Sequence, residues 1–513
     1  MVARGAGLSG LRLRAGAVLG GVAALVMVVP ALASSTPIVG PNVQVTQDRT
    51  PSRTNLAPFT LVDRSSSSTV YLSEVEADNG LCRFYVSQDG GSTWALGASP
   101  QTSSSGNCGP GAFHPEYIRT QLAQGSDGTL YYAFSANNPN GGGSRSALLG
   151  RSTDQGKTWH TTYIAHAPDG TSSTNYELDF ITHIAIDPSN PKLVYADFRR
   201  DFPKGSSQPA NRPYLVVSTD GGATFGTPRM ITDNDVEDDA PWLVAANGKI
   251  YASFLTNVNN FSSADFYVSY SSNQGQSWTQ TKFGSATSGD AVGLAYDSSR
   301  NQFYVVWDAE VGTSNNWHIN FATSSDTRSW SKPKQLNSDP ATDGRGHLFP
   351  HMSLSPSGRI DVAWYDFRND PTPPPDASNG GFGNWSDTYM VSSSDGGATW
   401  GPNIRLTDGL SNRNIGTFSF NLYYLVDQPG VASSDNTAVI AWTDTRNGDT
   451  DSQAQDIYSA VVNFSGSAAA GTYTTGDLVI VIVVVALAAL AAGIGITLLV
   501  SGRLARGRLR PSA

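Results

Sequence analysis

The chain has 513 residues and a formal net charge of −10. This length predicts two to four ordinary domains or one array of repeats. Gly (52) and Pro (28) stay below the levels of disordered or collagen-like chains, only 15% of residues are charged, and aromatic residues are plentiful. The composition therefore excludes a disordered or coiled-coil protein and favours a packed core rich in strands and turns.

Basic residues gather at the two ends of the chain. Seven of the 33 lie there, whereas all 43 acidic residues lie between Ser34 and Asp477. Because an acidic surface repels phosphate backbones, we expect no nucleic-acid partner.

The first 33 residues have the order of a secretory signal. Three arginines precede an apolar run over 15–29, and Ala31-Leu32-Ala33 follows as a small-residue cleavage site. We therefore predict a signal peptide over 1–33, with an uncleaved N-terminal anchor as the alternative.

The C-terminal end predicts a membrane anchor. Residues 478–500 carry no charge and are long enough to cross a bilayer as a helix. Four arginines follow in 501–513, which predicts a cytoplasmic tail, and 463–477 is a Ser/Ala/Gly/Thr stalk. We expect a single-pass type I protein of the cell membrane, with residues 34–462 outside the cell.

Cys82 and Cys108 are the only cysteines, and both fall in the region predicted to be extracellular. An even count in an oxidising compartment predicts one disulfide. No cluster of histidines or further cysteines accompanies them, so a metal or catalytic role is not indicated.

A short pattern, Ser-x-Asp-x-Gly-x-Thr-Trp, recurs six times at intervals of 52 to 70 residues. Four copies follow it closely. The copy from Ser271 has Asn for Asp, and the copy from Ser324 is one residue short and lacks the Gly. The central acid or amide residues of the six copies are Asp89, Asp154, Asp220, Asn273, Asp326 and Asp395.

The pattern has the chemistry of a hairpin turn. An Asp or Asn side chain accepts hydrogen bonds from the backbone N–H groups just ahead of it, and Gly adopts backbone angles that other residues resist. The Ser and Thr hydroxyls can satisfy the remaining turn groups. Short alternating strands such as Arg83–Val86 precede the copies, so each copy is predicted to join two antiparallel strands, with its aromatic ring packed under the turn.

This pattern resembles the Asp-box, or bacterial neuraminidase repeat, of the sialidase superfamily, and the resemblance covers nearly all of 34–462. In that family the boxes mark the blades of a β-propeller, with each turn on the outer rim between the third and fourth strands. The resemblance therefore implies an all-β propeller, to which the sequence adds one C-terminal transmembrane helix.

The number of blades follows from the rest of the repeat. A further copy without a box occupies 428–462, and the segment Gly40–Thr46 is similar to Gly401–Thr407, the strand after the sixth box. We favour seven blades, with the N-terminal strand completing the last one. The alternative is six blades, as in the best-known sialidases, plus an accessory strand pair.

Propeller geometry sorts the loops between two faces. The loops joining strands 2 to 3 and 4 to 1 share one face, and the boxes share the other. Cys82 is predicted in a 2–3 loop and Cys108 in a 4–1 loop, so both are expected on the face opposite the boxes. In the sialidase superfamily that face carries the binding cleft.

The resemblance implies three arginines that bind a carboxylate, which suits the bidentate guanidinium group. The family's Arg-Ile-Pro motif has no counterpart here, and Arg119 lies in the right region without matching it. Arg199, Arg368 and Arg446 each stand two residues after an aspartate at the end of a second strand. They are candidates for binding an anionic sugar, and the alternative is that they hold loops by local ion pairs.

The resemblance also implies an Asp acid/base and a Tyr nucleophile assisted by Glu. Asp308, Glu310 and Glu177 are the carboxylate candidates on the same face. Tyr423 and Tyr424 lie where the family's nucleophile would fall, and strand packing is their alternative role.

Metal binding is less well indicated. His347 and His351 form a His-x-x-x-His pair in a predicted loop rather than a helix, so a zinc site is not favoured. The segments Asp233–Asp239 and Asp444–Asp451 are rich enough in oxygen for Ca²⁺ but fit no calcium-loop template, and solvated acidic loops are the preferred interpretation. We expect no cofactor.

Two functions stay open from the sequence. One is a surface glycoside hydrolase of sialidase type that acts on terminal sugars. The other is a non-catalytic propeller that binds a glycan or a protein. Both give a glycan or glycoprotein as the expected partner of a monomeric ectodomain.

Overall fold

The computed structural model describes residues 36–47, 54–102, 108, 119–137, 144–166, 178–201, 212–232, 241–258, 263–310, 317–339, 345–372, 383–416 and 428–464. All of them belong to one compact unit, Ser35–Ser465. These residues form strands and turns without a helix, so none of them provides a helix that could span a membrane. The predicted signal peptide (1–33) and the predicted span (478–500) lie outside these ranges.

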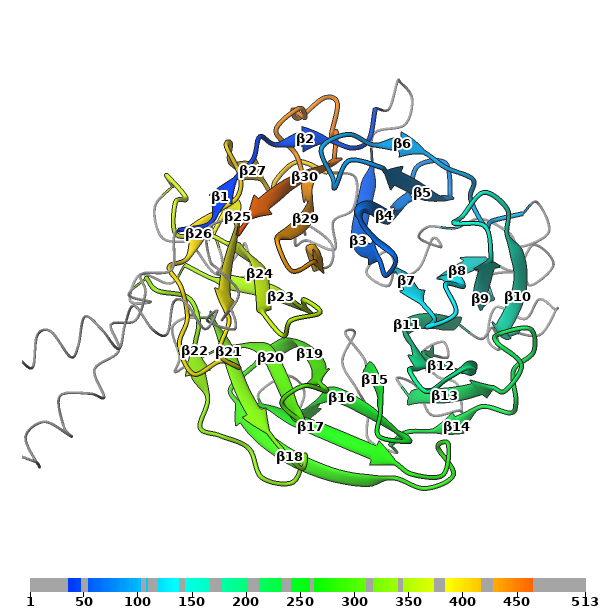
Figure 1. The fold of residues 1–513 in the computed structure, drawn as a ribbon. Coiled ribbons are helices and arrows are strands. Elements are labelled where there is room, and N and C mark those ends of the chain that lie inside the picture. Colours follow the sequence, from blue (N-terminus) through cyan, green and yellow to red (C-terminus); the bar gives the residue numbers. More distant parts are fainter. Residues whose placement is uncertain are drawn as a thin grey trace, which may run out of the picture. The chain divides into compact units, whose positions relative to one another are not determined.

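The strands form seven antiparallel blades around a ring, and in each blade the first strand is innermost (Figure 1). A single parallel bridge between Leu178 and Arg145 joins blades 2 and 3 into one eight-stranded sheet. Blades 1 to 6 take their strands consecutively from the chain. Blade 1 contains β3 (Asn55–Asp63), β4 (Ser66–Glu76), β5 (Leu81–Ser87) and β6 (Ala95–Leu96). Blade 2 contains β7 (Thr120–Gln124), β8 (Leu130–Asn137), β9 (Arg145–Ser152) and β10 (His160–Ala165). Blade 3 contains β11 (Leu178–Asp187), β12 (Asn190–Asp201), β13 (Arg212–Ser218) and β14 (Arg229–Met230). Blade 4 contains β15 (Trp242–Ala246), β16 (Lys249–Val258), β17 (Ser263–Ser271) and β18 (Thr279–Ala286). Blade 5 contains β19 (Gly289–Asp297), β20 (Gln302–Glu310), β21 (Trp317–Ser324) and β22 (Lys334–Gln335). Blade 6 contains β23 (His347–Leu354), β24 (Ile360–Asp366), β25 (Trp385–Ser393) and β26 (Ile404–Arg405), with the short β27 (Ser411–Asn412) beside β25.

Blade 7 is completed by the N-terminal segment. It contains β28 (Gly430–Ser433), β29 (Thr437–Asp444) and β30 (Asp456–Asn463), and both β1 (Ile38–Val39) and β2 (Val43–Gln44) pair antiparallel with β30. The seven-blade count and the closure of the ring by the N-terminal strand are thus confirmed.

The core is divided among the blade interfaces. Each of the seven interfaces between neighbouring blades holds one cluster of buried apolar side chains. The cluster that joins blade 7 to blade 1 contains Val45, Leu72, Tyr85, Ala441 and Ile457. Val45 comes from the N-terminal segment, so this segment supplies core packing as well as strand pairing.

The six Asp-boxes lie between the third and fourth strands of blades 1 to 6, as predicted. In the first box the Ser87 hydroxyl accepts a hydrogen bond from Gly91 N (2.8 Å), and Asp89 accepts from the backbone N and hydroxyl of Thr93 (2.8 and 2.6 Å). Asn273 replaces the carboxylate by accepting from Ser277 N at 3.0 Å and donating to its hydroxyl at 2.9 Å. The turn chemistry therefore survives the substitution.

Residues of the boxes also pack at the interfaces between blades. Gly156 has a φ of +82°, and a Cβ there would lie 2.4 Å from the Phe84 ring of the preceding blade. The Trp159 ring lies edge-on to the same Phe84 at 5.3 Å. The aromatic residue of this box packs between two blades as well as beneath its own turn.

Cys82 and Cys108 form the predicted disulfide, with Cα atoms 5.4 Å apart. Cys82 is the second residue of β5, just past the 2–3 loop, and Cys108 bridges to Ala136 at the end of β8. Both cysteines lie at the strand ends opposite the boxes, and we call this side of the ring the disulfide face.

Candidate functional site

Buried aspartates recur near the disulfide-face end of the second strand in four blades. They are Asp197, Asp308, Asp366 and Asp444, and each is 0% exposed. Asp197 accepts a hydrogen bond from His183 N, and Asp308 accepts one from Phe349 N of the next blade, both at 2.8 Å. These carboxylates therefore hold backbone in place, which accounts for their burial.

Two of the predicted arginines are ion-paired with the aspartate two residues before them. Arg368 contacts Asp366 through Nε at 2.9 Å and Nη2 at 2.6 Å. Arg446 contacts Asp444 through Nε at 3.0 Å and Nη2 at 2.7 Å. This is the arrangement of the alternative in which such pairs hold loops, and a role in ligand binding stays a prediction.

The other candidates are scattered. Arg199 is buried at 2% exposure on β12, and Glu310 is the half-buried last residue of β20. Arg199 belongs to blade 3, whereas Asp308 and Glu310 belong to blade 5. Glu177, Tyr423, Tyr424 and the acidic segment Asp233–Asp239 lie outside the described residues.

A different group of side chains meets at the centre of the ring. Phe59, His183, Trp242 and His351 come from the first strands of blades 1, 3, 4 and 6. The centroid of the Trp242 ring lies 4.2 Å from that of His183 and 4.9 Å from that of His351, and Phe59 lies 5.4 Å from His351. We call these four residues the central cluster.

Local backbone geometry positions two of these rings, those of Phe59 and His351. Pro58 and Pro350 precede Phe59 and His351, and the residues before the prolines have φ near +54° and +57°. The register of β3 and of β23 shifts at these points. Strained backbone of this kind costs energy and is often found where a protein binds or reacts.

The two histidines of the central cluster present opposite hydrogen-bonding groups. His183 Nδ1 accepts from Leu243 N at 3.4 Å, so its Nε2 carries the proton in the neutral ring. His351 Nδ1 lies 2.7 Å from Pro429 O, a pure acceptor, so Nδ1 carries the proton and Nε2 is an acceptor. The centre therefore offers one N–H donor and one nitrogen acceptor.

Electrostatics keeps both rings neutral near pH 7. Burial, helped by the positive charges of His351 and Arg119, lowers the pKa of His183 to about 3. Burial also lowers the pKa of His351 to about 4, and Arg119 acts in the same direction. Arg119, immediately before β7, thus contributes its charge to the centre.

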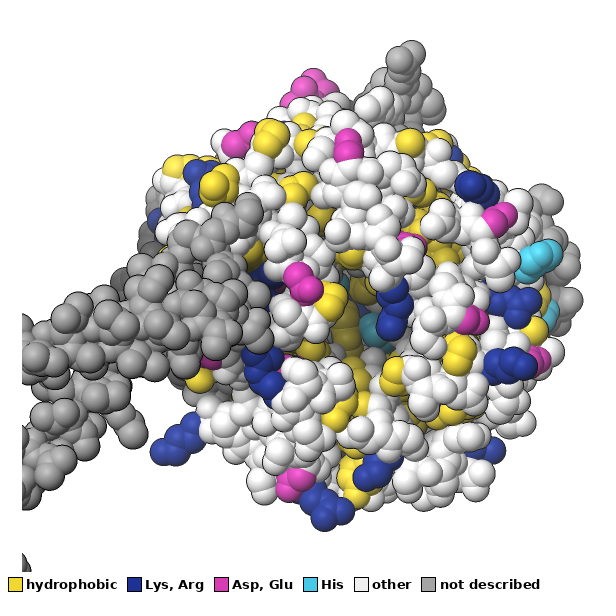
Figure 2. Space-filling view, in the orientation of Figure 1, with side chains coloured by type: hydrophobic (Ala, Val, Ile, Leu, Met, Phe, Trp, Pro, Cys, Tyr) yellow, Lys and Arg dark blue, Asp and Glu magenta, His cyan; other side chains and the backbone are white. Residues whose placement is uncertain are grey.

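The centre combines apolar ring faces with a few polar groups, as small-molecule sites do. Phe59 and Trp242 are only half-buried. The middle of the ring is hollowed in the space-filling view, and hydrophobic, cationic and histidine side chains border the hollow (Figure 2). Such a set can stack on a flat apolar face and hydrogen-bond to hydroxyl groups at its edge.

Sequence reasoning found this site only in part. It considered His351, as part of a His-x-x-x-His pair, but it did not single out Phe59 or Trp242. The available signal was the Pro that precedes three of the four residues, as in Pro241-Trp242.

The described residues include one group of at least three carboxylates or histidines close enough to bind a metal ion together: Asp339, His347 and Asp366. The segment Asp444–Asp451, for which a solvated acidic loop was the preferred interpretation over Ca²⁺ binding, is not part of it. Asp449 instead accepts hydrogen bonds from the backbone N of Asp451 and Ser452 at 3.0 and 2.6 Å.

Comparison with known proteins identifies the family. The sequence model of the BNR repeat-like domain matches residues 43–299, half of the chain, and the chain belongs to this family. Among curated proteins none matches the chain. Similar solved structures include an α-L-arabinofuranosidase from Fusarium graminearum, with 12% identity over 83% of this chain and 99% of that chain and a TM-score of 0.43. An α-L-arabinanase from Penicillium chrysogenum has 13% identity over 84% of this chain and 99% of that chain and a TM-score of 0.42. A Trypanosoma rangeli sialidase is also similar (12% identity, 68% of this chain, TM-score 0.40), and this chain spans about half of it, 54%.

Proposed function

From its membership of the BNR repeat-like domain family and the chemistry of the central cluster, we propose that this protein binds a glycan at the centre of its propeller. The observation that carries the proposal is the pair of neutral histidines of opposite hydrogen-bonding character on either side of Trp242. A sugar ring stacks its apolar face on an indole and needs both donors and acceptors for its hydroxyl groups. The positive charge of Arg119 would favour an acidic sugar.

Binding to a glycan array by the purified full-length protein tests this function. Trp242→Ala should weaken binding at least about 5-fold, since stacking of a ring contributes about 1 kcal/mol or more. Trp278→Ala, a rim box residue, is the matched control and should bind like the unmodified chain. Equal binding by Trp242→Ala and the unmodified chain would contradict the proposal.

The pH dependence of binding gives a second test. Because the pKa values of His183 and His351 lie at about 3 and 4, both rings stay neutral from pH 8 to pH 5. Binding should be constant over that range if the neutral rings take part, and it should fall below pH 4 as His351 Nε2 becomes a donor. A loss of binding centred near pH 6.5 would point to a histidine outside the cluster.

Hydrolysis is the second candidate function, and the half-buried Glu310 at the disulfide-face end of β20 is its carboxylate candidate. Release of a fluorophore from sialosides, arabinosides and neutral glycosides measures it. A hydrolase should lose turnover in Glu310→Gln while keeping its melting temperature. Glycan binding without turnover of any substrate would leave the non-catalytic propeller.

We also propose that the propeller is exposed at the cell surface, after removal of 1–33, on a span over 478–500. The Cys82–Cys108 disulfide supports an oxidising compartment. Protease treatment of intact cells should digest the propeller and leave a short membrane-bound fragment. Release of the whole chain by alkaline washing would contradict the anchor.

A further inference from the structure

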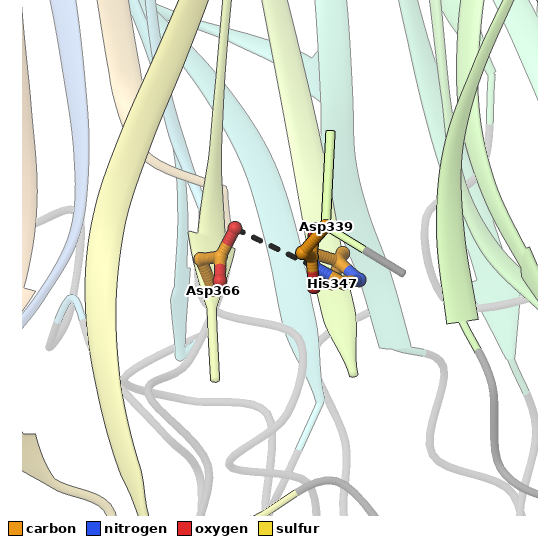
Figure 3. A group of neighbouring side chains, drawn as sticks. All are labelled: Asp339, His347 and Asp366. Atoms are coloured by element: carbon orange, nitrogen blue, oxygen red, sulfur yellow. Dashed lines mark ion pairs between the residues drawn. The ribbon is translucent and has the colours of Figure 1, made fainter. Parts of the chain in front are cut away.

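One histidine and two aspartates meet on the disulfide face between blades 5 and 6. His347 begins β23, Asp366 ends β24, and Asp339 lies in the connection that follows β22. Their side chains converge (Figure 3), with His347 Nε2 3.0 Å from Asp339 Oδ2 and 3.5 Å from Asp366 Oδ2. All three candidate ligand atoms lie within 4.8 Å of one another.

The histidine ring is held in the tautomer that a metal ion requires. His347 is 0% exposed, and its Nδ1 lies 2.7 Å from Trp317 O. A carbonyl oxygen only accepts, so Nδ1 carries a proton and Nε2 is left to face the carboxylates. Metal-binding histidines are oriented in this way, by donating their second ring N–H to a carbonyl or carboxylate.

The position of the carboxylates relative to Nε2 suits a metal ion. His347 Nε2 makes no hydrogen bond even though Asp339 Oδ2 is 3.0 Å away, so the oxygens flank the axis of this nitrogen. A proton on Nε2 would point between them. A metal ion about 2.1 Å from each ligand would contact all three, and its ligand atoms would stand about 3 to 3.4 Å apart, close to the separations of Nε2 from the two oxygens.

The neighbouring cation fixes the carboxylates without using His347. Arg368 Nη2 lies 3.1 Å from Asp339 Oδ1 and 2.6 Å from Asp366 Oδ2. It therefore leaves Asp339 Oδ2 to face the ring. Two carboxylates against one guanidinium leave one negative charge beside His347 Nε2, and this charge attracts a cation.

Blade 7 shows that the ion pair does not need the histidine. Asp444 accepts from Trp442 Nε1 at 2.8 Å and pairs with Arg446, as Asp366 does with Trp364 and Arg368. The sequence contains no histidine after His351, so blade 7 builds this arrangement without one. Arg446 also pairs with Asp408 of the preceding connection, as Arg368 does with Asp339, so His347 is the residue that blade 6 adds to this motif.

We propose that Asp339, His347 and Asp366 bind a zinc ion. One imidazole and two carboxylates suit Zn²⁺, and three protein ligands leave a fourth position for water or a ligand oxygen. The side chains of Asp339 and Arg368 are 16% and 15% exposed, so that position opens toward the disulfide face. This inference does not depend on the proposed glycan binding.

Zinc uptake by the full-length protein tests the site. Protein stripped with a chelator is titrated with ZnCl₂ against a chromophoric competitor, and one equivalent should bind. Asp339→Asn should weaken that affinity at least about 10-fold while the melting temperature of the metal-free protein stays unchanged, because the amide oxygen can still accept from Arg368. His160→Gln, which alters an exposed histidine on β10, is the matched control and should bind as the unmodified chain does.

A spectroscopic readout guards against a folding artefact in His347→Gln. Co²⁺ added to the unmodified chain should give visible d–d bands that Asp339→Asn alters and His347→Gln abolishes. Failure of the unmodified chain to take up zinc would overturn the proposal. Equal affinity and stoichiometry in Asp339→Asn and the unmodified chain would overturn it as well.

Discussion

Blades 6 and 7 build the same joint from differently connected pieces of chain. In blade 6 the fourth strand, β26, follows directly from the sixth box. In blade 7 the corresponding strand, β2, comes from the other end of the chain and is joined to the blade only by non-covalent contacts. The two blades therefore show what a covalent connection contributes and what side chains can replace.

The replacement is made by the same atoms. Asn403 donates to Leu336 O at 2.9 Å, and Asn42 donates to Leu406 O at 2.8 Å. Arg368 Nη2 reaches Asn403 Oδ1 at 3.2 Å, and Arg446 Nη2 reaches Asn42 Oδ1 at 3.1 Å. Each asparagine thus links its fourth strand to the preceding blade and to the arginine of its own blade.

One difference between the two joints is a cation beside a buried aspartate. Arg405 donates from Nε and Nη2 to Asp387 Oδ1 at 2.9 and 2.7 Å. Gln44 occupies the matching place opposite Asp456, and burial raises the pKa of Asp456 above its usual 3.8. The closing blade therefore lacks a cation that blade 6 has.

Deleting Ile38–Val45 should have the largest effect, because it removes strand pairing and the Val45 contact with blade 1. We expect a loss of roughly 4 kcal/mol or more in the free energy of unfolding, measured by urea denaturation. Ile38→Ser is the control, since this side chain is 65% exposed. An unchanged denaturation midpoint after the deletion would mean that β2 does not close the ring.

Arg446→Ala should follow, with a loss of about 2 to 4 kcal/mol, because Asp444 would keep a buried charge without its guanidinium. Arg368→Ala in blade 6 is the matched variant. The melting temperature should fall further for Arg446→Ala, since only that arginine binds a strand with no covalent link to its blade. If either variant lost glycan binding at an unchanged melting temperature, the arginine would instead be a ligand-binding residue.

Asn42→Ala should cost about 1 to 2 kcal/mol, since it removes the hydrogen bonds to Leu406 O and from Asp408 N. Asn403→Ala removes the equivalent pair, to Leu336 O and from Ser338 N, and serves as the comparison. Thermal melts of the two variants measure the difference. A neutral Asn42→Ala beside a destabilised Asn403→Ala would show that the two joints are not equivalent.

Gln44→Arg should stabilise the ring by about 0.5 to 1 kcal/mol at pH 7, because it supplies the missing cation to Asp456. The new ion pair should lower the pKa of Asp456, so the gain is present above that carboxyl's unfolded pKa and is lost as pH falls through its folded pKa. Melts at pH 7 and pH 3 should show the stabilisation only at the higher pH. Arg405→Gln in blade 6 should show the opposite change at pH 7.

Most of the fold was predictable because its signals are local. Each box carries its turn chemistry within eight residues, and the likeness of Gly40–Thr46 to Gly401–Thr407 reflects shared partners such as Leu336 O and Leu406 O. The likeness of two segments about 360 residues apart predicted the closure because both segments form the outer strand of a blade and bond to the preceding blade.

The candidate site was less predictable because its members are far apart in the chain. Phe59 and His351 are 292 residues apart and meet only once the ring is closed. The Asp-x-Arg pattern placed Arg368 and Arg446 just after the second strands of their blades, at the disulfide face. A pattern cannot tell whether a guanidinium faces a ligand or a neighbouring carboxylate. Asp339 carries no local signal, and only the packing of β23 beside blade 5 brings it to His347.

The direction of β30 sets the face of the propeller on which the described chain ends. β30 runs from Asp456, opposite Asp444 at the disulfide face, to Asn463, which pairs with Ile38 on the far side. Eight residues of strand span about 25 Å. The described part of the chain therefore ends, at Phe464, on the face that carries the boxes and not on the disulfide face.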